Sequence, residues 1–234
     1  MGLCPVAFHA GLRRRCSYKR RTVLLPEVCA AVIYCSLSSL TLDSELIYPR
    51  NIPAGARTDV PKPAPFGLTN SEDLMLPTPD GETLNAYLIR PENNSHARDV
   101  TVMMFHGNAG NIGHRLPIAR VVANDLNCNV FMLQYRGYGR STGNPTEKGI
   151  NIDAQTGLDY IRQHADLKST RLVLYGQSLG GAVAIALAAR NQANAEITAI
   201  ILENTFLSIQ KMIPRYVLVQ RLPMVLYLGL VLQY

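Results

Sequence analysis

The sequence lacks the cysteine patterns that mark a disulfide framework or a structural zinc site. Its 234 residues contain five cysteines, and no C-x-x-C pair occurs among them. Four of the five precede residue 36, whereas Cys128 stands just before an apolar run. We therefore expect no disulfide framework, no metal site and no cofactor, and we interpret Cys128 as a small core residue.

The sequence also lacks a basic stripe with interleaved aromatic residues, which is the pattern of a nucleic-acid-binding surface. The net charge is +6, but it comes from a cluster near the N-terminus, and the rest of the chain is close to neutral. This cluster precedes the first acidic residue and consists of Arg13, Arg14, Arg15, Lys19, Arg20 and Arg21. We expect no nucleic-acid partner.

A third absence concerns acid–base chemistry in the C-terminal part of the chain. The last histidine is His164 and the last aspartate is Asp166, and beyond them only Glu196 and Glu203 are acidic. Histidine is the most frequent general base in enzymes. Chemistry that needs a histidine after residue 164 therefore has no candidate within these 234 residues.

A serine motif occupies the stretch from residue 171 to residue 190. A short run of branched and aromatic residues predicts a buried strand, and the Ala/Leu-rich run that ends the stretch predicts a helix. Between them stands Gly176-x-Ser178-x-Gly180, the pattern of a nucleophile elbow, in which a serine is held on a strained strand-to-helix turn. The glycines are needed because Cβ atoms at those two positions would collide. We predict that Ser178 is a nucleophile.

A second glycine-rich box follows an earlier apolar run. Residues 100–105 lead into His-Gly-Asn-Ala-Gly-Asn at positions 106–111. Such a loop supplies one backbone N–H to an oxyanion hole, and the residue after the nucleophile supplies the other. We predict that these donors are Asn108 and Leu179. The residues expected to serve the structure of the loop and elbow, not the acid–base chemistry, are His106, Gly107, Gly176 and Gly180.

Strand and helix patterns alternate along the rest of the domain. Strands are expected at 73–76, 83–89, 100–105, 130–135, before the elbow and at 197–202; helices are expected at about 113–126, at 147–165 and after the elbow. The Asp80-Gly81 step predicts a tight hairpin between the first two strands. This alternation predicts an α/β fold with a mostly parallel sheet covered by helices on both faces.

The motifs together resemble one branch of the α/β-hydrolases. These motifs are His-Gly-Asn-Ala-Gly-Asn at 106–111, Tyr-Arg-Gly-Tyr-Gly-x-Ser-x-Gly-x-Pro at 135–145 and Tyr-Gly-Gln-Ser-Leu-Gly-Gly at 175–181. The branch is that of the membrane-anchored serine hydrolases that include the fungal bud-emergence protein and its animal relatives. The similarity covers roughly residues 46–214. It implies an N-terminal membrane segment, a Ser-Asp-His triad with Ser178 as nucleophile, and a small acyl ester or thioester as substrate.

The chain departs from that family after the elbow. In this fold the triad follows the order Ser, then Asp or Glu, then His. No histidine follows Ser178, and Glu203, which follows a strand, has no histidine to orient. We expect a C-terminally truncated α/β-hydrolase fold that lacks the last two strands and their helices. This chain is then expected to lack ester or thioester hydrolysis, although the family that it resembles is one of serine hydrolases.

Two alternative functions follow from the sequence. The first is a non-catalytic, membrane-tethered remnant or binding protein. The second is dinucleotide binding through Gly137-x-Gly139-x-x-x-Gly143, whose spacing misses the G-x-G-x-x-G fingerprint and whose helix is delayed by Pro145. Labelling of Ser178 by a fluorophosphonate distinguishes a hydrolase from both.

The domain organisation predicted from composition has four parts. Residues 1–45 form a basic N-terminus with a membrane anchor, 46–70 a proline-rich strap or linker, 71–214 a partial hydrolase domain, and 215–234 an apolar tail. The anchor is assigned to residues 28–42, which are uncharged and follow the basic cluster. An endomembrane location is expected, with a mitochondrial location as the alternative. A cleaved signal peptide and a disordered basic tail are the other interpretations of this N-terminus.

If residues 28–42 anchor the protein, alkaline carbonate should leave the full chain in the membrane pellet. A version that starts at Pro49 should be released, because it lacks both the basic cluster and the apolar run. The measurement is immunoblotting of the pellet and the supernatant. Release of the full chain would contradict membrane anchoring.

Overall fold

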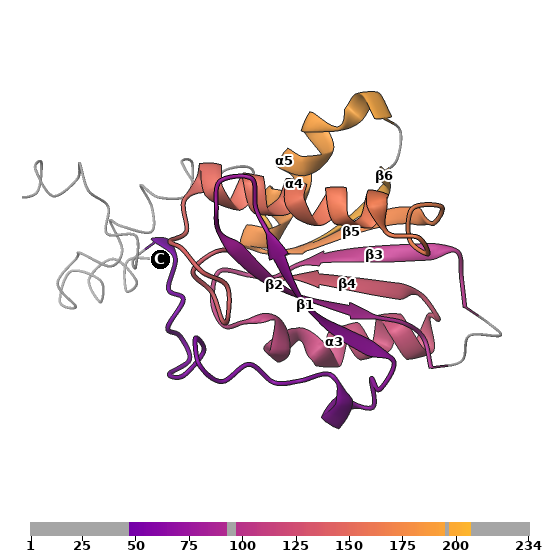
Figure 1. Cartoon of the computed structure of the whole chain (residues 1–234), viewed down its shortest axis with the longest axis horizontal. Helices are drawn as coiled ribbons and strands as arrows, with labels where there is room; N and C mark the ends of the chain where they lie inside the picture. The colour runs from indigo at the N-terminus through magenta and orange to yellow at the C-terminus, as the bar shows by residue number, and fades with distance from the viewer. Residues whose placement is uncertain (1–46, 93–96, 195–196, 207–234) are drawn as a thin grey trace, which may run out of the picture. The chain divides into compact units, whose positions relative to one another are not determined.

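The computed structural model describes residues 47–92, 97–194 and 197–206 (Figure 1). The chain divides into two compact units, residues 1–42 and 43–234, and every described residue belongs to the second. The predicted membrane anchor and the apolar tail lie outside the described residues. Within the described residues, no helix combines the length and the apolar character needed to cross a membrane.

The second unit is built on a six-stranded sheet with the order β1-β2-β4-β3-β5-β6 (Figure 1). β1 and β2 form an antiparallel hairpin, β2 is also antiparallel to β4, and β4, β3, β5 and β6 are mutually parallel neighbours. The strands are Ser71–Pro77 (β1), Thr83–Ile89 (β2), Val100–Phe105 (β3), Asn129–Leu133 (β4), Arg171–Gln177 (β5) and Ile197–Glu203 (β6). Parallel neighbours require long crossovers, and the helices supply them.

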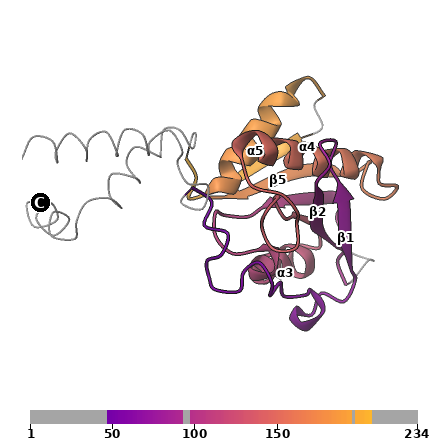
Figure 2. The same cartoon turned by 60° about the vertical axis from the view of Figure 1, so that its left-hand side comes forward.

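Helices cover both faces of this sheet. The helices α4 (Glu147–Gln163) and α5 (Leu179–Arg190) lie on one face, and α3 (Leu116–Arg120) lies on the other (Figures 1 and 2). Alternate residues of each central strand therefore enter two separate cores. In β3, Met103 and Phe105 join the core under α4 and α5, whereas Val102 and Met104 join the core under α3.

The helix expected at 113–126 is instead three short turns of different pitch. A 3₁₀ turn, Ile112–Arg115 (η3), leads into α3, which continues as a π turn, Val121–Asp125 (η4). The 3₁₀ turn is nucleated by Asn111, whose side chain accepts the His114 N–H in a capping box. Pro117 then suits the first turn of α3, because it has no N–H that needs an acceptor there. Two further 3₁₀ turns are η1 (Ala64–Phe66) and η5 (Gln192–Asn194).

The proline-rich segment before β1 packs on the α3 side of the sheet. Asn111 Nδ2 donates to the carbonyl oxygens of Ala56 and Asp59, both at 2.8 Å. Tyr87 donates its hydroxyl to the carbonyl oxygen of Pro61 at 3.1 Å, and Leu68 is fully buried. The segment thus contributes to the α3-side core and contacts the loop that follows β3.

A buried ion pair fixes the loop that follows β4. Arg136 donates through its backbone N–H and through Nε to the Asp153 carboxylate of α4, both at 2.8 Å. The same guanidinium donates to both oxygens of Asp80 in the β1–β2 hairpin, at 2.7 and 3.0 Å. Burial raises the pKa of Asp153, whereas hydrogen bonds from Arg136 lower the pKa of Asp80. One side chain therefore joins the hairpin, the loop and α4.

Removing one partner of this pair should destabilise the fold strongly. Asp153→Ala leaves the buried Nε and the backbone N–H of Arg136 without their acceptor, which we expect to cost about 3–5 kcal/mol. The control is Glu72→Ala, which breaks the more exposed pair with Arg90 and should cost less than about 1 kcal/mol. Urea denaturation of the full chain measures both. Equal midpoints for the two variants would contradict a structural role for the Arg136 pair.

Candidate active site

The two glycine-rich boxes meet because β3 and β5 are neighbours in the sheet. Their parallel register pairs Phe105 with Gly176, so both strands end at the same edge. Asn108 lies three positions beyond Phe105, and Leu179 lies three positions beyond Gly176. The topology therefore brings together the loop and elbow that the sequence predicted.

Ser178 occupies the strained turn that an elbow requires. Its φ of 52° and ψ of −113° lie in a region that residues with a side chain rarely adopt. A Cβ on Gly176 would overlap the carbonyl oxygen of Gly180, and a Cβ on Gly180 would overlap the carbonyl oxygen of Phe105. The strain, of order 1–3 kcal/mol, is thus maintained by backbone packing that only glycine permits.

Hydrogen bonds to the backbone of Ser178 fix the turn further. Its N–H donates to the carbonyl oxygen of Glu203 at 2.8 Å, so the end of β6 supports the elbow. The Ser178 carbonyl accepts from Thr205 Oγ1 at 2.9 Å and from the Gly181 N–H at 3.0 Å. The backbone of Ser178 is therefore bonded to α5 and to the segment after β6.

The two predicted oxyanion donors are held in place in different ways. Leu179 is the first residue of α5, so its N–H has no acceptor within the helix. Asn108 is held by its side chain, which donates through Nδ2 to the carbonyl oxygen of Ile47 at 2.6 Å. The Tyr138 hydroxyl bonds Asn108 Oδ1 at 2.9 Å and the Asn108 carbonyl oxygen at 3.0 Å. Tyr138, from the loop after β4, thus holds Asn108 in place, a contact that the sequence did not predict.

His106 is buried beneath the loop and bonded on both ring nitrogens. Nδ1 lies 2.7 Å from the carbonyl oxygen of Gly107, and Nε2 lies 2.8 Å from Nε2 of Gln134. A carbonyl can only accept, which assigns the proton to Nδ1 and makes Nε2 the acceptor from Gln134. Burial, together with the nearby Arg115 charge, lowers the pKa of His106 to about 3. The ring is therefore neutral and holds the loop.

The other described histidines also form hydrogen bonds to groups other than Ser178. His114 Nδ1 accepts from the Asn111 N–H at 3.3 Å, and His164 Nδ1 accepts from the Asp166 N–H at 3.2 Å. His9 and His96 lie outside the described residues. Among the described residues, no group of three His, Cys, Asp or Glu side chains is placed to hold a metal ion.

A polar chain beneath the elbow was also missed from the sequence. Glu203 accepts hydrogen bonds from the Tyr175 hydroxyl and from Gln177 Nε2, the latter at 3.1 Å. Gln177 Oε1 in turn accepts from Arg115 Nε at 3.3 Å. The sequence gives one signal for this row of hydrogen-bonded side chains, which is that Glu203 directly follows a predicted strand. That position indicated only a triad acid.

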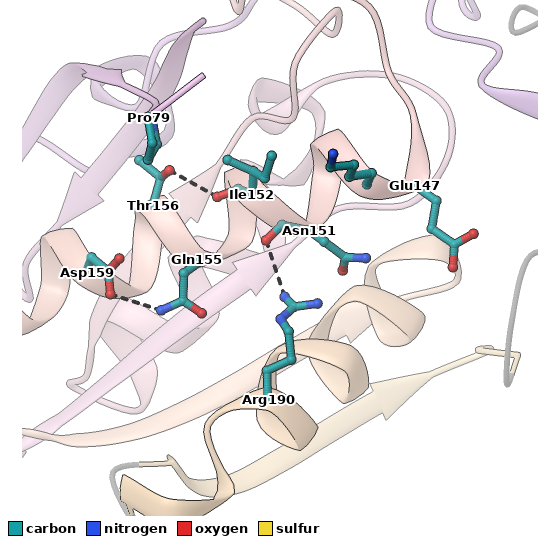
Figure 3. Close-up of a pocket in the computed structure, with 9 residues that line it drawn as sticks. Pro79, Glu147, Asn151, Ile152, Gln155, Thr156, Asp159 and Arg190 are labelled. Carbon is teal, nitrogen blue, oxygen red and sulfur yellow. Dashed lines mark hydrogen bonds between the residues drawn. The ribbon is translucent and has the colours of Figure 1, made fainter. Parts of the chain in front are cut away.

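A separate groove of about 850 Å³ lies along α4 (Figure 3). It is lined by α4, by Arg190 at the end of α5 and by Pro79 of the hairpin, and it includes no residue of either glycine-rich box. Its polar groups bond one another: Arg190 Nη2 donates to the Asn151 carbonyl at 3.2 Å, and Gln155 donates to Asp159 at 2.9 Å. This groove is distinct from the elbow.

Comparison with known proteins supports the same interpretation. The chain matches the family described as serine aminopeptidase, S33, over residues 96–232. Protein bem46 of Schizosaccharomyces pombe is 52% identical over 169 residues, covering 72% of this chain and 55% of that protein. The α/β-hydrolase domain-containing protein WAV2 of Arabidopsis thaliana is 41% identical over 175 residues, covering 74% and 54%. The chain thus spans about half the length of the curated relatives it matches.

A third relative is an uncharacterized membrane protein of Saccharomyces cerevisiae, which is 39% identical over 171 residues, covering 73% of this chain and 57% of that protein. Among solved structures, an α/β-hydrolase of Vibrio vulnificus superposes with a TM-score of 0.60 at 21% identity, covering 73% of this chain and 59% of that one. An esterase of Pyrococcus furiosus superposes with a TM-score of 0.56 at 22% identity, covering 71% and 60%. These structures share the fold.

The resemblance and the α/β fold class inferred from the sequence are both confirmed. Three observations indicate the same family: the strand order, the conformation of the elbow serine, and the family match over more than half of the chain. The chain belongs to the α/β-hydrolases, within the family described as serine aminopeptidase, S33.

Proposed function

We propose that this chain carries the nucleophile and the oxyanion hole of a serine hydrolase that acts on ester or thioester bonds. The observation that carries the proposal is the conformation of Ser178, held at φ 52° on the β5–α5 turn beside the loop that contains Asn108. A strained serine at a strand-to-helix turn is the arrangement that exposes Oγ to a substrate.

The chemistry that this arrangement serves is acyl transfer. Ser178 Oγ attacks the acyl carbon, and the N–H groups of Asn108 and Leu179 stabilise the oxyanion that forms. The positive N-terminal end of α5 favours the same negative charge. The bond to the leaving oxygen or sulfur then breaks, which leaves an acyl-serine for water to hydrolyse.

The proton of Ser178 needs an acceptor, because a serine hydroxyl is a weak nucleophile at its own pKa. His106 is unsuited to this task, since it is buried, neutral and bonded at both nitrogens. No histidine follows Ser178 in the sequence. We infer that the general base comes from outside these 234 residues and that the chain alone does not turn over.

A non-catalytic protein that is tethered to a membrane remains the second candidate. It is favoured by the cluster of six basic residues before residue 22. Membrane attachment also has support from the yeast relative, which is described as a membrane protein. In that case the elbow region binds a ligand without cleaving it.

If the base is missing, the chain should hydrolyse p-nitrophenyl acetate no faster than its Ser178→Ala variant. In subtilisin, loss of the triad histidine costs roughly 10⁶-fold in kcat. Joining the chain to the C-terminal part of protein bem46 should restore activity and labelling by a fluorophosphonate, and Ser178→Ala should then abolish both. Activity of the unextended chain that depends on Ser178 would show that a base is already present.

The buried neutral His106 predicts a pH dependence of stability. Its pKa is about 3 when folded and about 6.5 when unfolded. The unfolded chain therefore binds more protons between these values, and stability falls as the pH drops below 6.5, by about 1.4 kcal/mol per pH unit for one group. Above pH 6.5 this penalty is absent.

The test compares urea midpoints of the full chain at pH 7.0, 5.5 and 4.5 with those of His106→Gln, which should have a shallower slope. Gln155→Met on α4, which removes no titratable group, is the control and should keep the wild-type slope. Parallel slopes for wild type and His106→Gln would disprove the neutral, buried assignment.

A further inference from the structure

Gln177 occupies the centre of the polar chain beneath the elbow. It lies between Gly176 and Ser178 and uses both ends of its side-chain amide. Oε1 accepts from Arg115 Nε at 3.3 Å, and Nε2 donates to Glu203 Oε1 at 3.1 Å. The residue that precedes the nucleophile is thus bonded to two elements that lie far from it in the sequence.

Arg115 lies directly against the loop that carries the other oxyanion donor. A Cβ built on Gly110 would come within 2.7 Å of Arg115 Nη1, and a Cβ on Gly107 would come within 3.4 Å of Nη2. The Cβ on Gly107 would also lie 3.5 Å from Gln177 Oε1. The guanidinium and the amide therefore fill the space next to the residue before Asn108.

Glu203 connects this side chain network to the backbone of the nucleophile. Its carboxylate accepts from Gln177 and from the Tyr175 hydroxyl, and its carbonyl oxygen accepts the Ser178 N–H at 2.8 Å. The hydrogen bonds from Tyr175 and Gln177 lower the pKa of Glu203, and the charge of Arg115 acts in the same direction. The carboxylate is therefore ionised and charge-assisted in its bonds to Tyr175 and Gln177.

We propose that Arg115, Gln177, Glu203 and Tyr175 form a brace that couples the His106–Asn111 loop to the Ser178 elbow. The brace keeps the two oxyanion donors at a constant separation. Its members are positioning residues, because they act through Gly107, Gly110 and the Ser178 backbone. The purpose of the brace rests on the proposed function, because it concerns the oxyanion donors. The coupling of loop and elbow is a mechanical property of the fold.

This role differs from that of a triad acid. A triad acid orients an imidazole, whereas the Glu203 carboxylate is bonded to Tyr175 and Gln177 within the sheet. The pairing of Gln177 with Glu203 in the β5–β6 register places the two side chains next to each other. The brace therefore gives Glu203 a role that needs no histidine.

The coupling is tested by amide hydrogen exchange of the full chain, followed by mass spectrometry. Gln177→Met removes both hydrogen bonds of the amide while keeping the length of the side chain. We expect exchange to rise about tenfold both in peptides covering 104–111 and in peptides covering 174–181, as for the loss of one or two buried hydrogen bonds. Peptides from the β1–β2 hairpin should exchange as in the wild type.

The matched control is Gln155→Met, the same change at an amide on α4 that bonds Asp159 and Asn191. It should leave the loop and elbow peptides unchanged. Arg115→Met should reproduce the effect of Gln177→Met, and Arg115→Lys should restore most of the protection, because it retains the N–H donor and the positive charge that acts on Glu203. Glu203→Gln keeps the backbone carbonyl and should also raise exchange in both peptides. This variant replaces Gln177→Met in the test if Gln177→Met does not fold.

Unchanged exchange in either peptide would overturn the brace, and so would an equal rise in the hairpin, which would indicate general destabilisation. Equal behaviour of Arg115→Lys and Arg115→Met would overturn the role of the cation. The experiment requires no turnover, so a failure of Ser178 to react with a fluorophosphonate would leave this result standing. Loss of coupling would likewise leave the assignment of Ser178 as nucleophile untouched.

Discussion

The structure of the Ser178 elbow depends on one unfavourable backbone conformation. Ser178 adopts a positive φ that its side chain disfavours, and the surrounding packing must supply the compensating energy. Gly176 and Gly180 allow the β5–α5 turn to close against the end of β3. The carbonyl oxygen of Glu203 then holds the Ser178 N–H. The elbow is therefore stable only when β3, β5 and β6 are already assembled.

The loop on the other side of the site is held by segments that are distant in the sequence. Ile47 and Ile52 precede the sheet, and their carbonyl oxygens accept from the Asn108 side chain and from the Gly110 N–H. Tyr138 follows β4 and bonds Asn108, and Gln134 bonds His106. The loop itself is short and rich in glycine, so its conformation comes from these contacts. The segment before β1 is thus part of what shapes the site.

Features that depend on local chemistry could be predicted from the sequence. The bounds of β2 and β3 follow from their residue patterns, and the elbow follows from the Gly176-x-Ser178-x-Gly180 spacing between a strand pattern and a helix pattern. The predicted helix at 113–126 was wrong as a single α-helix, because the segment passes from the 3₁₀ turn η3 through α3 to the π turn η4. The catalytic roles of Ser178, Asn108 and Leu179 stay predictions.

The polar networks could not be predicted, because each joins residues that lie far apart in the chain. Arg115 and Gln177 are 62 positions apart, and Arg136 reaches Asp80 across 56 positions. Spacing rules describe neighbours along one helix or strand, and they say nothing about which side chains a parallel sheet brings to the same edge. Only the assembled fold identifies these partners.

The pairing of Phe105 with Gly176 has a consequence for how such a chain can change during evolution. Asn108 and Leu179 each lie three positions beyond a member of that pair. Inserting or deleting one residue in β3 or β5 would shift one donor relative to the other by roughly 3.3 Å, which is longer than a hydrogen bond. Length variation should therefore be confined to the connections at the opposite edge, such as the one before β3, where added residues leave this pairing intact.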